Sequence, residues 1–409
     1  MPVLTNIAQL ATCPPDNPQS DAGLISDATI AWTGDTIRWV GRRDRLPAEF
    51  SDEAEIDGKG RLVIPGLIDC HTHLCFGGWR GDEFDLRISG ASYQEIAAAG
   101  GGIASTVAAT RSAEIEELLG KAGEALDGML SLGVTSVECK SGYGLDEVNE
   151  FKQLSVYQQL DTIHVIDLFP TFLGAHIVPP EYSGDRERYI RLICEKLIPE
   201  ITKKGLAQFC DVFVEQGAYT VGEGRQILMA ASEHGLLLKV HADQLSDGGG
   251  ALLAAELGAV SAEHLEYISA EGIAALSNSG TVAVSLPLAS LYLAEPYLPA
   301  RNLLEAGVPV AVATDFNPGS APSYHLPLAM TLACLNQRMT PQEALNGATT
   351  VAARAISAQD RIGSLSPGFR ADLAIIDAPS LNQWLYHFVP NACLGVIKNG
   401  EWVVNMHGA

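Results

Sequence analysis

The sequence predicts an α/β protein, a (β/α)8 TIM-like barrel with a small β-sandwich domain formed from both chain termini. Apolar, strand-like runs alternate with patterned helical segments through the middle of the chain, and eight such runs can be counted from residue 62 onward. Eight strands alternating with helices is the count of this barrel. Both chain ends are instead rich in β-type residues. We therefore expect the sandwich at residues 1–62 plus 366–409 and the barrel at residues 63–365.

The two ends each contain a hairpin signal. Apolar runs at 28–32 and 36–40 flank Thr33-Gly34-Asp35, which predicts a three-residue turn. Near the other end, Asn399-Gly400 separates the runs 394–398 and 401–405. Asn-Gly between two apolar runs is a strong hairpin signal because both residues accept a positive φ. One sheet domain built from both ends is the simplest interpretation.

The first barrel strand is expected within Leu62–Ile68, whose apolar density around the Pro65-Gly66 break suits a strand buried on both faces. The remaining predicted strands and helices follow by the same reasoning. Strands are expected at 134–139, 165–173, 209–214, 236–240, 259–262, 281–286 and 308–313, and helices at 113–132, 145–161, 185–203 and 221–233.

The composition limits the classes of partner. The chain has 409 residues, 47% of them hydrophobic, with a formal net charge of −23 and a pI near 4.7. Such an acidic surface repels phosphate backbones and anionic lipids, so we expect neither nucleic acid nor membrane as a partner. A small anionic substrate would need a local cationic pocket. The sequence does not decide between a monomer and a homodimer.

The cysteines and the N-terminus point to the cytoplasm. The chain has eight cysteines, none in a CxxC pair, at positions 13, 70, 75, 139, 194, 210, 334 and 393. Scattered thiols inside apolar runs are expected to be reduced core residues and not a disulfide framework. No Lys or Arg precedes Arg38, and no apolar run is long enough for a signal peptide or a membrane span.

The chemistry is expected where the strands stop, since barrels of this type carry their sites at the carboxyl ends of their strands. The first strand runs into Asp69-Cys70-His71-Thr72-His73. Residues two apart on a strand point to the same side, so His71 and His73 would present two imidazoles together. Paired neutral imidazoles suit zinc or iron. The alternative is two polar residues in a surface loop.

Later strands end in further candidate ligands. His241 follows the fifth strand and Asp315 the eighth, which lies beside the first when the barrel closes. Together with His71 and His73 they form a set of three nitrogens and one carboxylate, which leaves room for water. Taken alone, His241 would sooner be a core imidazole bonded to the backbone, and Asp315 would serve equally well as a helix cap before Pro318. His264 is expected to donate to the substrate carbonyl, with a fifth ligand or a structural histidine as alternatives.

Several sequence motifs, together with these candidate residues, resemble those of a known enzyme family. The motifs PGLIDCHTHL and GSLSPGFRADLAIID, with His241, His264 and Asp315, resemble the amidohydrolase superfamily. Within it, FGGWRGDEF, AAAGGGIASTV, ECKSGYGL, FLGAH, HADQLSDGGGA and ATDFNPGS are similar to the imidazolonepropionase family. The resemblance covers most of residues 60–378. It implies hydrolytic opening of 4-imidazolone-5-propanoate to N-formimidoyl-L-glutamate in histidine degradation, with one zinc or iron ion.

The resemblance also implies roles for single residues. Its metal ligands match His71, His73, His241 and Asp315. Its substrate contacts match a further set from the motifs FGGWR, KSGYG, FLGAH and DFNPGS, namely Arg80, Tyr143, His176, Asn317, Gly319 and Ser320. An arginine suits the propanoate tail because its planar fork pairs with a carboxylate. Without the resemblance, Arg80 would read as a solvated arginine paired with Asp82, and Tyr143 as a packing aromatic. Tyr93 is a weaker candidate for the cavity lining.

Two positions refine the expected chemistry. Related deaminases carry a Glu three residues after the fifth-strand His, whereas this chain has Gln244. A carboxamide does not shuttle protons, so Gln244 is assigned to orienting the ring and Asp315 to the proton transfer. Lys140 ends the second strand, whereas two-metal relatives use a lysine on the fourth, so a single metal is expected. A deaminase or amidohydrolase acting on another small nitrogen heterocycle and a non-catalytic scaffold remain the alternative functions.

Overall fold

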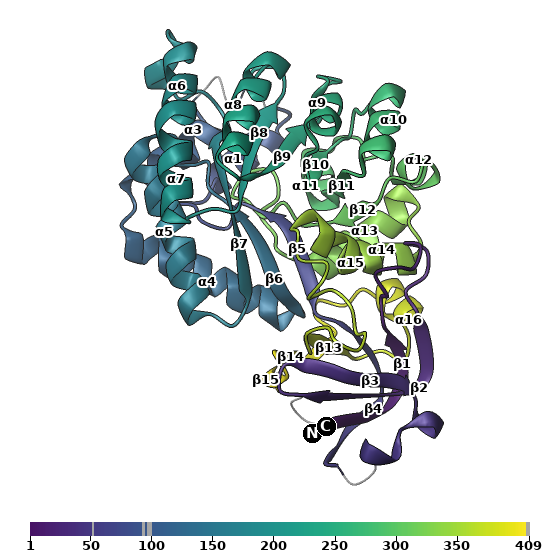
Figure 1. Ribbon diagram of the computed structural model, residues 1–409. Coiled ribbons are helices and arrows are strands. Elements are labelled where there is room, and N and C mark those ends of the chain that lie inside the picture. Colours follow the sequence, from purple (N-terminus) through teal and green to yellow (C-terminus); the bar gives the residue numbers. More distant parts are fainter. Residues whose placement is uncertain (51–52, 92–94, 96–99, 406–409) are drawn as a thin grey trace.

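The computed structural model describes residues 1–50, 53–91, 95 and 100–405. The chain forms a barrel and, below it in Figure 1, a sheet domain that contains both chain ends. The barrel sheet has eight strands and the terminal sheet has seven. The predicted fold class, a (β/α)8 barrel with a small β-sandwich domain from both termini, is confirmed in that the termini form a separate domain, whose seven strands make up a single sheet.

The barrel strands are parallel and follow one another in chain order around the sheet. They are β5 (Leu67–Thr72), β6 (Val134–Lys140), β7 (Asp167–Ala175), β8 (Phe209–Val214), β9 (Leu237–Ala242), β10 (Ser261–His264), β11 (Val282–Ser285) and β12 (Val310–Val312). The sheet closes where the backbone after β12 meets β5. Asp315 N donates to His71 O at 3.1 Å, and His73 N donates to Phe316 O at 2.8 Å. Because the strands are parallel, their carboxyl ends share one rim.

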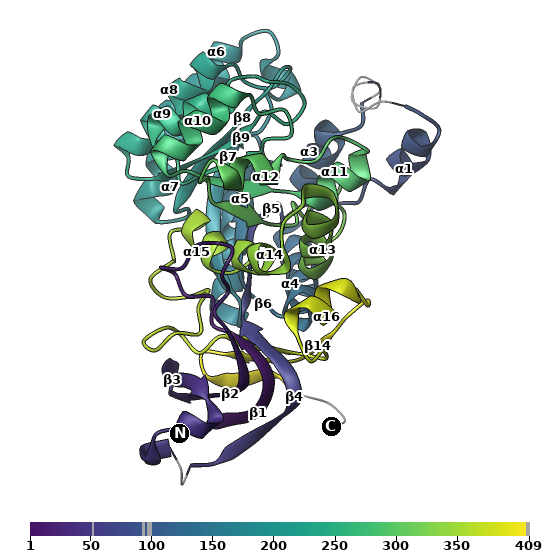
Figure 2. The same cartoon turned by 90° about the vertical axis from the view of Figure 1, so that its right-hand side faces the viewer.

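Helices cover the outside of the barrel (Figures 1 and 2). They are α1 (Gly81–Ile88), α3 (Ile103–Ser112), α4 (Ile115–Ser131), α5 (Glu147–Ile163), α6 (Arg186–Leu192), α7 (Ile198–Lys204), α8 (Val221–Glu233), α9 (Gly250–Leu257), α10 (Ala270–Ser279), α11 (Pro287–Leu293), α12 (Ala300–Glu305), α13 (Leu326–Gln337), α14 (Pro341–Gly347), α15 (Thr350–Ala355) and α16 (Leu381–Tyr386). Short 3-10 helices cover Arg43–Arg45, Ala48–Phe50 and Pro180–Tyr182.

Local sequence signals explain why several helices begin where they do. Thr220 caps α8 and accepts from Glu223 N, while the Glu223 side chain accepts from Thr220 N, which completes a capping box. The predicted helix at 185–203 is interrupted by a π-helical turn, Ile193–Leu197, between α6 and α7. The other three predicted helices correspond to α4, α5 and α8 within two residues at each end.

The terminal strands form one continuous mixed sheet. Its order is β15-β14-β13-β4-β1-β2-β3. Its members are β1 (Val3–Ala11), β2 (Leu24–Thr33), β3 (Thr36–Arg42), β4 (Glu55–Pro65), β13 (Leu373–Ile376), β14 (Cys393–Lys398) and β15 (Glu401–Val404). The Asn399-Gly400 hairpin is confirmed, because Lys398 pairs with Glu401. The predicted three-residue turn was one residue too long: Thr33 pairs with Thr36, and only Gly34 and Asp35 lie between them.

The apolar run expected to be a single barrel strand is divided between the two sheets. Residues up to Pro65 belong to β4 and pair with β13, whereas β5 begins at Leu67 and pairs with β6. Gly66 makes the transition, and a Cβ there would lie 2.3 Å from Thr135 Oγ1. The run is apolar throughout because all of it is buried: Leu62 and Ile64 pack in the large barrel cluster with Leu67 and Ile68, whereas Val63 faces the core of the terminal sheet. Our prediction of one strand across it was wrong for that reason.

Helices α14 and α15 lie between the barrel and the terminal sheet (Figure 2). Gln19, from the segment after β1, joins the domains: its Nε2 donates to Val310 O at 2.6 Å, and its Oε1 accepts from Val310 N at 3.0 Å. All eight cysteines are free thiols, as expected. Among the described residues, the helices are too short or too polar to cross a bilayer.

Candidate metal centre and substrate cavity

The predicted ligands come together at the carboxyl end of the barrel. His71 lies in β5, His241 in β9, His73 just after β5, and Asp315 three residues after β12. All four side chains are buried, with 3% exposure or less. The interpretation of His71 and His73 as solvent-facing loop residues is therefore excluded.

Distances within this group suit one cation. The Nε2 atoms of His71 and His73 lie 3.3 and 3.4 Å from Asp315 Oδ1, and His241 Nε2 lies 3.4 Å from His73 Nε2. Ligand atoms held tetrahedrally at about 2.0–2.1 Å from a metal are themselves about 3.4 Å apart. Two facing imidazole nitrogens also need a cation or a proton between them. The donor set therefore fits a divalent metal ion.

The opposite ring nitrogens of two ligands face carboxylates. His71 Nδ1 lies 2.7 Å from Glu263 Oε2, and His241 Nδ1 lies 2.8 Å from Asp211 Oδ2. Both carboxylates are fully buried. A carboxylate at one ring nitrogen places the proton there and leaves the other nitrogen free to bind a metal. This arrangement again supports a metal centre at the Nε2 atoms.

A buried layer of charges lies beneath the ligands. Lys140 Nζ lies 2.8 Å from Glu138, 2.9 Å from Asp211 and 3.0 Å from Glu263, while Lys239 Nζ contacts the other oxygen of Glu263 at 3.0 Å. With three carboxylates around it, Lys140 acts as their counter-ion. Sequence reasoning missed this layer, although its signal was present: charged residues inside otherwise apolar strands.

The pKa values of the ligands reflect this environment. Burial opposes the charged form of His71, but Glu263 and Asp315 raise its pKa to about 9. Burial lowers the pKa of His73 to about 3. Burial also disfavours ionised Asp315, yet hydrogen bonds from His71 and His73 hold its pKa well below the usual range. His73 is thus held neutral and Asp315 ionised, the states in which these groups bind a metal, whereas His71 must release its Nε2 proton to bind one.

The backbone at the rim is unusual at two of the candidate residues. Asp315 has φ of 56° and His264 has φ of 76°. Non-glycine residues rarely adopt a left-handed conformation, and such strain concentrates at functional sites. It turns both side chains inward at the points where their strands end.

A cavity of about 180 Å³ opens onto the centre. Most of the predicted site residues line it, namely His73, Arg80, Tyr143, His176, His241, Gln244, His264, Asp315, Asn317 and Ser320. Of the remaining predicted residues, His71 lies beneath it and Gly319 behind Arg80. Glu215, at the end of β8, accepts from the backbone N–H of Leu245 at 2.8 Å and so fixes the loop that carries Gln244.

Arg80 is buried, with 8% exposure, and is not the solvated arginine of the alternative interpretation. Within the described part of the chain, its Nε and Nη1 have no hydrogen-bond partner. Its nearest carboxylate oxygen is that of Glu83, 3.8 Å from Nη1. The guanidinium packs on Gly319, where a Cβ would lie 0.9 Å from Nη2. A buried guanidinium with free donors fits an anionic group of a ligand.

The remaining predicted residues surround His73 or shape the rim. The His176 ring stacks on that of His73 with centroids 5.2 Å apart, and Tyr143 lies 5.3 Å from His176. The Asn317 side chain is used within its own loop, because its Oδ1 accepts from the N–H groups of Gly319 and Ser320, each at 2.8 Å. Tyr93 lies outside the described residues.

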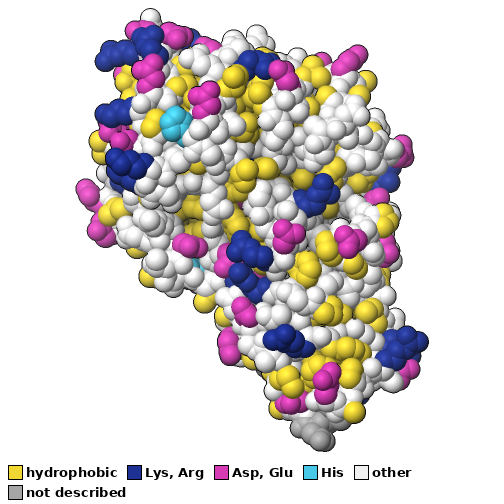
Figure 3. Space-filling model, viewed as in Figure 1, with side chains coloured by type: hydrophobic (Ala, Val, Ile, Leu, Met, Phe, Trp, Pro, Cys, Tyr) yellow, Lys and Arg dark blue, Asp and Glu magenta, His cyan; other side chains and the backbone are white. Residues whose placement is uncertain are grey.

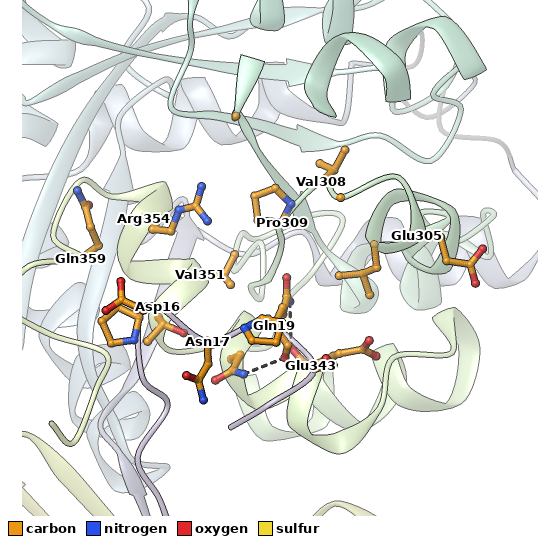
Figure 4. A pocket seen from close by; sticks show the side chains of 18 of the residues that line it. Asp16, Asn17, Gln19, Glu305, Val308, Pro309, Glu343, Val351, Arg354 and Gln359 are labelled. Carbon is orange, nitrogen blue, oxygen red and sulfur yellow. Dashed lines mark hydrogen bonds between the residues drawn. The ribbon is translucent and has the colours of Figure 1, made fainter. Parts of the chain in front are cut away.

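A second cavity, of about 890 Å³, lies on the other side of the barrel and holds none of the predicted site residues. Figure 4 shows it between the segment that carries Asp16, Asn17 and Gln19 and a wall that includes Arg354 and Gln359. It borders Pro309, directly before β12, and therefore faces the amino end of that strand. Of these two cavities, the smaller one is lined by the candidate metal donors and substrate contacts.

Comparison with known proteins agrees with this geometry. A model of the amidohydrolase family matches residues 62–403. The chain is 47% identical to imidazolonepropionase of Geobacillus kaustophilus over 94% of this chain and 92% of the relative. It is 46% identical to imidazolonepropionase of Bacillus velezensis, with 100% and 98% of the two chains covered.

Solved structures share the fold at lower identity. Klebsiella pneumoniae 5-methylcytosine deaminase superposes with a TM-score of 0.76 at 18% identity, covering 100% of this chain and 98% of the other. A zinc-bound adenosine deaminase from Xanthomonas campestris gives 0.72 at 18% identity, covering 99% and 93%. These likenesses establish the architecture only. The full-length matches near 47% identity are closer, and on them the chain belongs to the amidohydrolase family and, within it, to the imidazolonepropionases.

Proposed function

We propose that this enzyme hydrolyses 4-imidazolone-5-propanoate to N-formimidoyl-L-glutamate with the help of one divalent metal ion. The observation that carries the proposal is the convergence of three imidazole Nε2 atoms and Asp315 Oδ1 at separations of 3.3–3.4 Å. His73, His241 and Asp315 line the same cavity as Arg80. A carbonyl-activating centre and an anion-binding group therefore face one small space.

We propose His71, His73, His241 and Asp315 as the metal ligands. A divalent cation held by these residues would lower the pKa of a water molecule toward neutrality and would polarise the ring carbonyl. The nitrogen-and-carboxylate donor set accommodates zinc and iron alike. Lys140 is already held by three buried carboxylates, which supports a single-metal centre.

Two residues of the chain are assigned to the proton of the attacking water and to the negative charge that develops on the carbonyl oxygen. Asp315, ionised because its pKa is held low, takes the proton of the attacking water and passes it to the ring nitrogen that leaves. The water oxygen bonds to the carbonyl carbon, and the ring C–N bond breaks. His264, 2% exposed and lining the cavity, donates to the carbonyl oxygen as negative charge develops there.

Substrate orientation is assigned to the cavity walls. Arg80 pairs with the propanoate carboxylate, and Gln244 hydrogen-bonds the ring. Tyr143 and His176 pack beside His73 and restrict the ring plane. Asn317 shapes the loop whose Gly319 and Ser320 adjoin Arg80 and Asp315, since Ser320 Oγ lies 3.4 Å from Asp315 Oδ2. The free cysteines support our placement of the reaction in the cytoplasm.

The experiment is turnover of imidazolone propanoate by purified protein before and after chelation. We expect ring opening to stop on metal removal and to return with zinc or with iron(II), and metal analysis should give one ion per chain. Unchanged turnover in metal-free protein would disprove the mechanism. Release of ammonia from an aminated pyrimidine or purine would instead favour the deaminase alternative.

A further inference from the structure

A second arginine, Arg87, lines the same cavity as Arg80. The two residues flank helix α1, Arg80 at its N-cap and Arg87 in its last turn. Residues seven apart on an α-helix lie on one face, since 3.6 residues make a turn. Glu83 and Phe84 lie between them on that face. Helix α1 therefore directs both guanidinium groups toward one side.

The surroundings of Arg87 hold it at the cavity rim. Its Cζ lies 5.2 Å from the centroid of the Tyr292 ring on α11. The centroids of the Phe84 and Tyr292 rings are 6.3 Å apart. Helices α1 and α11 lie near each other at one end of the barrel (Figure 2). The Nε atom of Arg87 is buried and has no hydrogen-bond partner in the described part of the chain. The face of Tyr292 supports the cation without neutralising it.

Two carboxylates near the arginines each have a hydrogen-bond donor of their own. Glu295 lines the cavity, but its Oε2 accepts from the Tyr267 hydroxyl at 3.1 Å. Glu83 Oε1 accepts from the backbone N–H of Gly102 at 2.8 Å. Neither carboxylate is hydrogen-bonded to the Arg87 Nε, which has no partner among the residues that the structure describes. A positive group with free donors thus remains at the entrance.

Overall charge makes such a group useful. The protein has a formal net charge of −23, and on the face shown in Figure 3 acidic and basic side chains are interspersed over both domains. An anionic substrate is therefore repelled by the molecule as a whole and must be attracted by a local field. Two arginines around one small cavity provide it.

We propose that Arg87 is a specificity-determining residue that, together with Arg80, binds the substrate carboxylate. This inference rests on the proposed function. Arg80 receives the tail inside the cavity, and Arg87 closes over it from the rim. The pair selects ring substrates with an anionic side chain over neutral ones of the same size.

The test compares the acid with its methyl ester as substrates for the metal-loaded enzyme. For Arg87→Gln we expect the KM for imidazolone propanoate to rise about 10- to 150-fold, the range of one lost charge-assisted hydrogen bond. The KM for the ester should change less than about twofold, and kcat should hold for both, because the lost contact is to the tail and not to the reacting atoms. Arg87→Lys should recover part of the KM, since it keeps the charge without the fork.

A second variant separates binding from packing. Tyr292→Leu removes the ring under Arg87 and keeps the charge, so it should leave the preference for acid over ester nearly unchanged. Equal KM increases for acid and ester in Arg87→Gln, or reproduction of its effect by Tyr292→Leu, would mean that Arg87 only anchors α1 and would overturn the inference. A wild-type KM for the acid in Arg87→Gln would overturn it as well. Failure of the wild-type enzyme to open the ring would instead overturn the proposed function.

Discussion

His71 Nδ1 lies 2.7 Å from Glu263 Oε2, and the same oxygen lies 3.0 Å from Lys140 Nζ. One buried carboxylate thus joins a candidate metal ligand to a buried ammonium group. Lys140 and Lys239 keep Glu263 ionised: burial opposes the charge, but the two lysines hold the pKa of Glu263 well below its usual range. An ionised Glu263 keeps the His71 proton on Nδ1 and leaves Nε2 free to bind a metal.

Replacing Glu263 with Gln should therefore weaken metal binding. Loss of such an outer carboxylate typically lowers metal affinity about 10- to 100-fold. Competition between the protein and a chelator of known affinity would measure the change. Glu256→Gln is the matched control, because Glu256 is an exposed ion-pair partner of Arg225. Equal metal affinity in the Glu263 variant and the control would contradict this role.

Removing the ligand His241 should abolish turnover. We expect kcat/KM of His241→Ala to fall at least about a thousandfold, because the loss of metal-assisted charge stabilisation costs several kcal/mol in the transition state. The metal content of the purified variant should also fall, which inductively coupled plasma mass spectrometry would measure. His234→Ala is the control, since His234 is exposed at the end of α8. Substantial turnover by the His241 variant would exclude it as a ligand.

Gly319→Ala should displace the Arg80 guanidinium. A Cβ at residue 319 would lie 0.9 Å from Arg80 Nη2, a contact that only movement of one partner relieves. We expect KM to rise about tenfold with a smaller change in kcat, as for Arg80→Ala, because both changes weaken charge-assisted binding of the carboxylate. Steady-state kinetics would measure both constants.

Gly120→Ala is the control for this substitution. A Cβ at residue 120 would meet no atom within 4 Å, so this variant should match the wild type in KM. Wild-type KM in Gly319→Ala would mean that Arg80 does not need its present position.

Stability should fall in acid because His176 is buried as a neutral ring. Burial, with the neighbouring His73, lowers the pKa of His176 from 6.5 to about 3. Between these values the unfolded chain binds a proton that the folded chain does not bind. The free energy of unfolding therefore decreases as the pH falls from 6.5 toward 3. The contribution of His176 to this decrease is about 1.4 kcal/mol per pH unit, and above pH 6.5 His176 has no effect on the pH dependence.

Urea unfolding of the metal-loaded wild type and of His176→Gln between pH 6 and pH 4 would test this dependence. The free energy of unfolding of the variant should fall less steeply with decreasing pH, and the difference in slope should correspond to about one bound proton. Identical slopes for the two proteins would contradict the neutral state of His176.

The sequence alone determined the architecture and most of the candidate site. Eight apolar runs separated by helical patterns predicted the barrel, because burial on both faces makes parallel strands apolar throughout. Polar residues at the ends of these runs then identified His71, His73, His241 and Asp315, since parallel strands end at one rim. The same apolarity misled us at Leu62–Ile68: hydrophobic pattern reports burial, and not which of two sheets a residue is buried in.

Tertiary structure decided what depends on contacts between distant segments. Asp211, Glu263 and Lys140 lie on three different strands, and the barrel brings an oxygen of each carboxylate to within 3.0 Å of Lys140 Nζ. Gly319 and Arg80 are likewise distant in sequence, so the need for a glycine became visible only where the guanidinium packs on it. Sequence periodicity fixes which way a side chain points along its own element, whereas the partner it meets is set by how the chain closes on itself.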